Sequence, residues 1–137
     1  RKVAYVPPSG GSVEVWGDGK QTRSFLYIDE CIEATRRLMD SDFQGPVNIG
    51  SEEMVTIDEL VDITAKVANK VVTKVYDLSA PRGVMGRNSN NDLIKKELDW
   101  DYEQSLEEGI RKTYGWIAWE ISKEMYSEEN TVSMNLN

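Results

Sequence analysis

The sequence predicts an α/β fold of the α+β kind, in which helices pack on a small mixed sheet. Segments rich in β-branched and aromatic residues alternate along the chain with amphipathic segments of helical period. Two S/T-x-x-E sequences, at 56–59 and 105–108, have the form of capping boxes and mark helix starts. The 137 residues are enough for one domain with a core of its own. Three or four strands are in evidence, so we expect a small sheet.

The first third of the chain predicts strand, turn, strand and helix. Apolar and polar residues alternate at 13–16, and the Gly-Asp-Gly at 17–19 indicates a turn. The run at 24–28 is aromatic and β-branched, as in a strand. Asp29 is the expected N-cap of a helix whose apolar face continues to Ser41.

The middle of the chain predicts two more strands around a second helix. Residues 42–46 interrupt the helical pattern, and 47–49 predict a short strand that ends at Gly50. The capping box that starts at Thr56 opens a helix with an apolar face. Residues 71–76 are rich in β-branched types and predict another long strand.

The last third predicts a long loop, two helices and a tail. The loop at 78–91 contains proline, glycine and asparagine, and loops of this length inside compact domains are often functional. A short helix is expected at 92–98, and the second capping box opens a helix to about Met125. Because 127–137 shows no periodicity, we expect residues 1–126 to form the domain and the remainder a disordered tail.

The composition excludes several classes of function. With 16 Lys and Arg against 24 Asp and Glu, the net charge is −8, which argues against binding nucleic acid or an anionic membrane. The chain has no histidine, so Ser/His/Asp or Cys/His catalysis and His-ligated metal sites are excluded, and we expect no metal. A single cysteine cannot form an internal disulfide, which favours a cytoplasmic setting.

Packing roles are expected for the cysteine and for three tryptophans. Cys31 falls on the inner face of the first long helix and is expected to be a small core residue, not a nucleophile. Trp100, Trp116 and Trp119 are expected packing anchors, not platforms for stacked bases. Adjacent helical residues point in different directions, so Asp29 is assigned to capping and not to a catalytic carboxylate pair.

The Gly-Asp-Gly turn is followed by four side chains that donate hydrogen bonds, Lys20, Gln21, Thr22 and Arg23. Glycine lets the backbone approach a ligand, and the planar guanidinium of Arg23 can bond two phosphate oxygens at once. The alternative is a hairpin turn in which Arg23 pairs with one of the many carboxylates. The residues alone leave both interpretations open.

The loop at 78–91 carries a second set of polar residues. Arg82 and Arg87 supply two guanidinium groups in an acidic chain. Hydroxyl and amide side chains suited to sugar hydroxyls or a base edge lie beside them, namely Asn88, Ser89, Asn90 and Asn91. The alternative is an exposed polar linker that ends in a helix cap. If both loops serve one site, its ligand is anionic and polyhydroxylated, such as a nucleotide sugar.

Several segments resemble the extended short-chain dehydrogenase/reductase superfamily and, within it, the GDP-mannose 3,5-epimerase family of NAD-dependent sugar-nucleotide epimerases. The more specific matches are Gln-Thr-Arg-Ser-Phe at 21–25 and Gly-Arg-Asn-Ser-x-Asn at 86–91. Further matches occur at 46–51 and 106–110, always in family order. The resemblance covers roughly residues 1–125.

The resemblance implies the C-terminal substrate-binding domain of such an enzyme, without its Rossmann core. It implies that Gln21, Thr22 and Arg23 bind substrate and that Arg87 contacts the nucleotide diphosphate. Ser89, in the same segment, is also expected to bind substrate. The family uses tightly bound NAD to oxidise the hexose transiently, invert carbons 3 and 5 and reduce it again. Here no tyrosine is followed four residues later by lysine, and the dinucleotide-binding glycine motif is absent. We therefore expect no catalytic residue and no NAD binding in this chain alone.

The expected function is the GDP-sugar-binding portion of an epimerase that is not active by itself. One alternative is a stand-alone binding or interaction module derived from such an enzyme. Another is the equivalent part of a related sugar-nucleotide dehydratase or 4-epimerase. Apolar surface left uncovered on the early strands and helix predicts self-association or pairing with a Rossmann-domain portion.

Overall fold

Two small sheets organise the computed structural model, which describes the backbone of residues 1–134 and the side chains of residues 1–124. The strands are β1 (Gly11–Trp16), β2 (Thr22–Ser24), β3 (Met54–Thr56), β4 (Val72–Asp77) and β5 (Gly86–Arg87). The helices are α1 (Lys2–Tyr5), α2 (Ile28–Asp40), α3 (Ile57–Ala68), α4 (Asp92–Leu98) and α5 (Leu106–Met134). The expected fold class, helices with a small mixed sheet, is confirmed.

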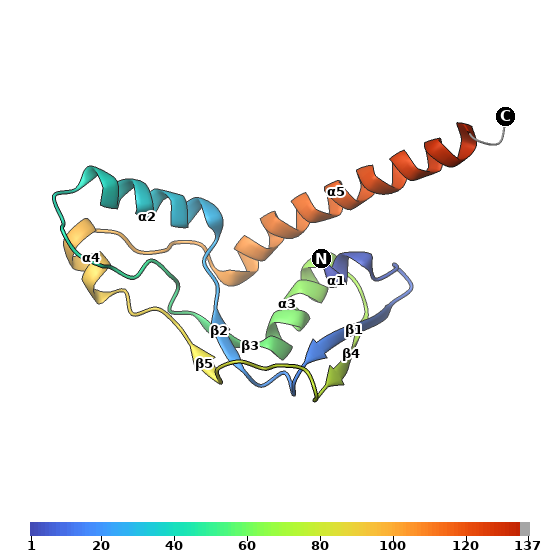
Figure 1. Cartoon of the computed structure of the whole chain (residues 1–137), viewed down its shortest axis with the longest axis horizontal. Coiled ribbons are helices and arrows are strands. Elements are labelled where there is room, and N and C mark those ends of the chain that lie inside the picture. Colours follow the sequence, from blue (N-terminus) through green and yellow to red (C-terminus); the bar gives the residue numbers. More distant parts are fainter. Residues whose placement is uncertain (135–137) are drawn as a thin grey trace.

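The two sheets divide the molecule into two lobes. Strands β1 and β4 pair in parallel, with α1 and α3 beside them, and these four elements form the α1/α3 lobe. Helices α2 and α4 form the α2/α4 lobe (Figure 1). Between the lobes lies the second sheet, in which β2 is antiparallel to β3 and parallel to β5. Helix α5 starts between the lobes and extends away from them.

Each lobe has its own apolar core. In the α1/α3 lobe the buried residues are Val3, Val6 and Val13, with Ala68, Val72 and Tyr114 packed against them. In the α2/α4 lobe they are Ala34, Ile94 and Trp100, surrounded by Leu26, Val47, Ile49, Leu98 and Tyr102. The expected packing role of Trp100 is therefore confirmed.

Both capping boxes form as predicted. The Thr56 hydroxyl accepts a bond from the Glu59 backbone N–H (3.1 Å), and the Glu59 carboxylate accepts one from the Thr56 N–H (2.7 Å). At the start of α5, the Ser105 N–H donates to the Glu108 carboxylate (2.9 Å). Helix α4 has the predicted bounds, and α5 continues past Met125 to Met134. Residues 135–137 of the expected tail lie outside the described residues.

The predictions for the segment at 24–28 and for the start of α2 were wrong. Strand β2 ends at Ser24, and α2 starts at Ile28 with Tyr27 as its N-cap, whose side chain makes no capping bond. Asp29 is therefore in the first turn, where a carboxylate still favours the helix dipole, and it is not the cap. Residues 25–27 lie between the strand and the helix and belong to neither, although their aromatic composition resembles that of a strand.

One other strand prediction was wrong, and one strand was not predicted. Residues 47–49 are not a strand, because among the described residues no neighbouring strand pairs with them. Conversely, the loop at 78–91 contains β5, which pairs with β2. Strand pairing depends on a partner distant in sequence, and here the partner, not local composition, decides the outcome.

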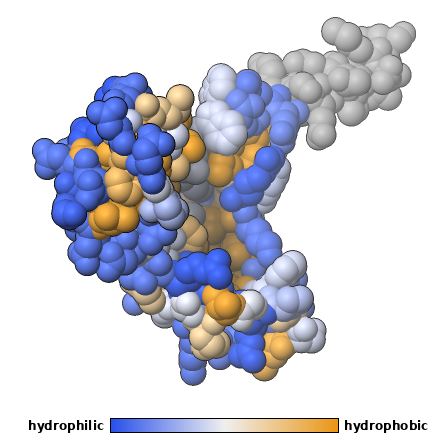
Figure 2. All heavy atoms as spheres, turned by 60° about the vertical axis from the view of Figure 1, so that its left-hand side comes forward, coloured by the Kyte–Doolittle hydropathy of each residue, from blue (hydrophilic) through white to orange (hydrophobic). Residues whose placement is uncertain are grey.

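Several residues expected inside lie at the surface. Trp116 and Trp119 are 61% and 56% exposed, so their predicted packing role is wrong. Cys31 is half-buried. Figure 2 shows hydrophobic residues gathered in the hollow between the two lobes. Among the described helices, none combines the length and the apolar character that a bilayer crossing requires.

Candidate functional site

The turn after β1 is fixed by backbone and side-chain bonds. Gly17 and Gly19 have φ of +80° and +73°, a conformation that favours glycine. Gln21 is 6% exposed, and its amide Nε2 donates to the Trp16 carbonyl at 2.9 Å, which closes the turn. Its Oε1 is buried and accepts no hydrogen bond within the described part of the chain. This turn leads into β2 and not into a helix.

Asp58 supports the same turn. The Asp58 backbone N–H donates to the Gly19 carbonyl at 3.0 Å, and the Asp58 carboxylate accepts a bond from the Tyr76 hydroxyl at 3.1 Å. Burial raises the pKa of Tyr76, and the neighbouring Asp58 raises it further. The tyrosine hydroxyl therefore stays protonated and keeps donating. Asp58 was not predicted from the sequence.

The β2–β5 pairing brings the two predicted loops together. The Thr22 N–H donates to the Met85 carbonyl at 2.8 Å, and Arg23 lies opposite Arg87 in the parallel register. Paired residues on neighbouring strands point to the same face, and such strands are about 4.8 Å apart. The guanidinium-bearing side chains of Arg23 and Arg87 therefore leave one face of the sheet side by side. The hairpin alternative is wrong, because β1 and β2 belong to different sheets.

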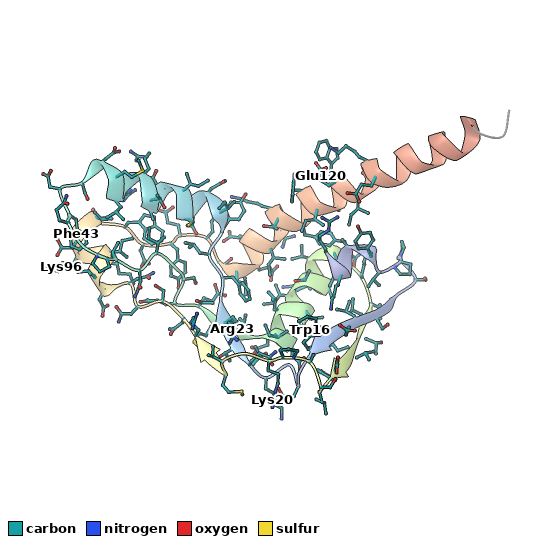
Figure 3. All side chains as sticks on the ribbon, in the orientation of Figure 1. Trp16, Lys20, Arg23, Phe43, Lys96 and Glu120 are labelled. Atoms are coloured by element: carbon teal, nitrogen blue, oxygen red, sulfur yellow. The ribbon has the colours of Figure 1, made fainter. Side chains whose placement is uncertain are left out.

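The guanidinium of Arg23 is held by two backbone carbonyls. Its Nη1 donates to the Thr22 carbonyl at 2.6 Å and its Nη2 to the Val84 carbonyl at 2.7 Å. A guanidinium has five N–H donors, so three remain for a ligand. Figure 3 shows Arg23 on β2, between the two lobes, and Lys20 at the bottom of the turn.

Among the described residues, carboxylates pair with most arginines but not with Arg23 or Arg87. Of the seven arginines, five form ion pairs, namely Arg1, Arg36, Arg37, Arg82 and Arg111. Within the described side chains, no carboxylate oxygen lies within 4.0 Å of a guanidinium nitrogen of Arg23 or Arg87. Two like charges opposite one another in a sheet repel, and an anion bound between them would relieve this. The alternative in which Arg23 pairs with a carboxylate is therefore not what the structure shows.

Arg82 differs from Arg87 although both lie in the same loop. It pairs with Asp18 (3.6 Å), and its aliphatic stem packs so closely over Gly17 that a Cβ there would collide with it. Arg82 therefore joins the loop at 78–91 to the turn at 17–19. Its guanidinium is engaged by a carboxylate, unlike that of Arg87.

Ser89 lies at the end of the same loop and bonds within the protein. Its hydroxyl donates to Asn91 Oδ1 at 2.6 Å, and its backbone N–H donates to the Ser51 carbonyl at 3.3 Å. Asn91 is fully buried and donates from Nδ2 to the Gly50 carbonyl at 2.9 Å. Asn91 was expected to lie on an exposed loop or contact a ligand, and Gly50 was expected only to end a strand. We call these contacts, between 50–52 and 89–91, the loop clasp.

A pocket of about 530 Å³ lies elsewhere, between α3, α5 and the segment at 25–28. Its wall is mostly apolar and aromatic, with Phe25, Leu60, Ile110 and Trp116 among the lining residues. None of the predicted site residues lines it. Glu30 holds the Gln104 part of the wall, because its Oε1 accepts from the Gln104 N–H at 2.9 Å. This pocket suits apolar contact better than an anion.

Among the described residues, no three His, Cys, Asp or Glu side chains are grouped so that they could hold a metal ion. The polar site consists of the turn at 17–21 and the β2–β5 pair. It offers two guanidinium groups on one face and a buried amide oxygen nearby. The guanidinium groups are donors and can bind an oxyanion, whereas the amide oxygen is an acceptor and can bind a hydroxyl or a water.

Comparison with known proteins gives a consistent result. Residues 3–50 match the model of the NAD-dependent epimerase/dehydratase family. The chain is similar to GDP-mannose 3,5-epimerase of Arabidopsis thaliana, with 50% identity over 111 residues, which are 81% of this chain and 29% of the relative. The specific resemblance predicted from the sequence is thereby confirmed.

Solved structures agree with the fold. UDP-glucose 4-epimerase from Thermotoga maritima matches with 25% identity and a TM-score of 0.74 over 80% of this chain and 36% of that one. UDP-glucuronic acid 4-epimerase from Bacillus cereus matches with 28% identity and a TM-score of 0.71 over 77% and 35%. The chain spans about a third of the length of the proteins it matches. By sequence and fold, this chain is similar to a C-terminal part of the enzymes of the NAD-dependent epimerase/dehydratase family.

Proposed function

We propose that this chain is the part of a sugar-nucleotide epimerase that holds the diphosphate of its substrate. The observation that carries the proposal is the pairing of Arg23 with Arg87 on neighbouring strands, without a carboxylate partner for either among the described residues. Two planar guanidinium groups on one face match the oxygens of a diphosphate, which they bind as charge-assisted pairs.

Other predicted residues support the same site. Gln21 has a buried Oε1 without a donor among the described residues, which leaves it free to accept from a ligand hydroxyl or a water. The backbone of Thr22 fixes β5 to β2, and the Thr22 hydroxyl lies on the opposite face from Arg23. We therefore assign the main charge contacts to the two arginines and a sugar or water contact to Gln21.

GDP-mannose is the first candidate ligand because the relative at 50% identity is named for it. The solved structures with the same fold include an enzyme crystallised with UDP-glucose, so a UDP sugar is the second candidate. A preference for UDP-glucose would favour the equivalent part of a related 4-epimerase or dehydratase. The arginine pair recognises the diphosphate that both ligands share.

The family name implies NAD, and the residues described here do not fit it. A dinucleotide site needs a glycine-rich turn between a strand and a helix, so that the helix N-terminus meets the pyrophosphate. In this chain the turn at 17–19 joins β1 to β2, and its glycines pack against Arg82 and Asp58. We therefore propose that the chain does not epimerise a sugar by itself.

The binding proposal is tested by titration calorimetry with GDP-mannose, GDP and UDP-glucose. Replacing Arg23 or Arg87 by alanine should weaken binding about 10- to 100-fold, the effect of losing one hydrogen-bonded charge. Arg111→Ala is the matched control, because Arg111 is exposed and already pairs with Glu107 (2.9 Å). Binding that is equally strong in Arg23→Ala and Arg87→Ala would contradict the proposal. Conversion of GDP-mannose by this chain with NAD would contradict the claim that it is inactive alone.

A second function, a stand-alone interaction module, is favoured by the apolar surface. Ile28, Ile32 and Met39 of α2 are exposed, and the pocket at α5 is lined mainly by apolar residues. Such surfaces are typical of contacts with other proteins. If the fold is stable but no nucleotide binds, this function is the better one. Size-exclusion chromatography over a range of concentrations checks it, and a monomer at every concentration would contradict self-association.

A further inference from the structure

We propose that Asn91 is a positioning residue, which holds Arg87 in place beside Arg23 through the loop clasp. This inference rests on the proposed anion site and adds to it a residue that need not touch the ligand. Asn91 has no exposed surface, so a ligand bound by the Arg23 and Arg87 side chains does not reach it. Its effect on binding must therefore act through the backbone that carries Arg87.

Every polar group of Asn91 is engaged. Its Oδ1 accepts from the Ser89 hydroxyl at 2.6 Å, and its Nδ2 donates to the Gly50 carbonyl at 2.9 Å. Its backbone N–H donates to Glu52 Oε1 at 3.0 Å, and its carbonyl accepts from the Lys95 N–H at 3.0 Å. One side chain thus joins the loop that follows β5 to the segment before β3. Removing one partner of a buried hydrogen bond costs more than the net contribution of the bond, because the remaining partner stays buried without water.

Strand β5 needs this support because it is only two residues long. On its N-terminal side it is fixed by the bond from the Thr22 N–H to the Met85 carbonyl. On its C-terminal side the fixed point after Arg87 is Ser89, two residues on, which bonds Ser51 and Asn91. Without the clasp, the loop at 87–91 has one attachment fewer, and the side chain of Arg87 is free to leave its position opposite Arg23.

The packing of Gly50 supports the same inference independently. A Cβ at position 50 would lie 2.6 Å from the Ser89 Cβ and 3.0 Å from its Oγ. The two loops therefore touch backbone to side chain, and only glycine permits that distance without a shift.

The first experiment needs no ligand. Backbone amide exchange is measured by NMR for the full chain and for Asn91→Ala, with Asn48→Ala as the matched control, because Asn48 is an exposed asparagine on the segment before Gly50. The Thr22 amide donates to the carbonyl of Met85, the residue before β5. It should exchange at least about 10-fold faster in Asn91→Ala, which is the effect expected from losing one buried hydrogen bond. The Glu59 amide in the α3 capping box should not change.

An unchanged Thr22 amide overturns the proposal. Equal acceleration at Thr22 and Glu59 also overturns it, because the effect is then a general loss of stability. If Asn91→Ala does not fold, Ser89→Ala replaces it, since that change removes only one bond of the clasp. The same pattern of amides is then expected, and its absence has the same meaning.

The second experiment links the clasp to binding. Asn91→Ala should weaken GDP binding about 10-fold in calorimetry, and it should have no further effect in a chain that already carries Arg87→Ala. Additive losses would mean that Asn91 does not act through Arg87, and they would overturn the proposal. If the unaltered chain binds no GDP, the proposed function fails, while the amide experiment still decides whether Asn91 holds β5.

Discussion

Replacing Gly50 by alanine tests the loop clasp through stability. The added Cβ would lie 2.6 Å from the Ser89 Cβ, whereas carbon atoms in contact prefer about 3.5–4.0 Å. One of the two loops must therefore move by about 1 Å. Backbone or Cβ atoms cannot swing aside as the end of a long side chain can, so the cost is that of overpacking, about 1–3 kcal/mol.

The movement should also break a hydrogen bond. If Ser89 withdraws, its 2.6 Å bond to Asn91 Oδ1 is lost, and a buried acceptor without a donor costs about 1–3 kcal/mol. These two costs do not add, because the chain relaxes in whichever of the two ways costs less. We therefore expect Gly50→Ala to lower the free energy of unfolding by about 1–3 kcal/mol.

Urea denaturation followed by circular dichroism measures this change, with the slope against urea unchanged between variants. Gly115→Ala is the matched control, because an added Cβ there meets no atom within 4 Å and Gly115 is inside α5. Alanine favours a helix interior over glycine by about 0.5–1 kcal/mol, so the same substitution should stabilise at this position. If the Gly50→Ala variant is as stable as the unaltered chain, the loop clasp is refuted.

Three further changes test the core, a cap and an ion pair. Ile94→Ala removes a fully buried side chain from the α2/α4 core and should cost about 2–5 kcal/mol in urea denaturation; a loss under about 1 kcal/mol would contradict that packing. Thr56→Ala should cost about 1 kcal/mol in thermal denaturation, whereas Thr56→Ser, which keeps the cap oxygen, should cost less. Hydrogen bonds from Arg36 and Arg37 lower the pKa of Glu33 to about 2, so its stabilising effect is present above about pH 4.5 and is lost as the pH falls through about 2. The difference in stability between the unaltered chain and Glu33→Gln should therefore shrink over that range, and a difference independent of pH would contradict it.

The helices were predictable because their signals are local. The Thr56 to Glu59 and Ser105 to Glu108 boxes need only residues within one turn, and both form. Helix α4 likewise has its predicted bounds. The failure at Asp29 has a local cause too, since the extended N-cap is Tyr27, two positions before Asp29, and α2 starts without a side-chain cap.

Strand pairing was not predictable, because it depends on distant partners. The strand predicted at 47–49 has no neighbour among the described residues, and its apolar side chains pack into the α2/α4 core instead. Strand β5 is too short to give a periodic signal, and it exists because β2 lies beside it. Trp116 and Trp119 follow the helical period of α5, yet no described element covers that face.

Much of the site was predictable from residue chemistry, whereas its support was not. Arginines in two glycine-containing loops of an acidic chain indicated both Arg23 and Arg87. The pairing of β2 with β5 places them together. Asn91 gave no comparable signal, because asparagine is as common in exposed turns as in buried hydrogen-bond networks. Its role is visible only from its burial and from the contact of Ser89 with Gly50.

The different roles of the three arginines near β2 and β5 explain why two of them have no carboxylate partner among the described residues. Arg82 is neutralised by Asp18 and fixes the loop to the turn. Arg23 is held by two carbonyls, which orient its guanidinium without cancelling its charge. If Arg87 is held by the clasp in the same way, both charges are in position before an anion arrives, and little conformational entropy is lost on binding. Mutations in the clasp should then weaken binding without removing any atom that touches the ligand.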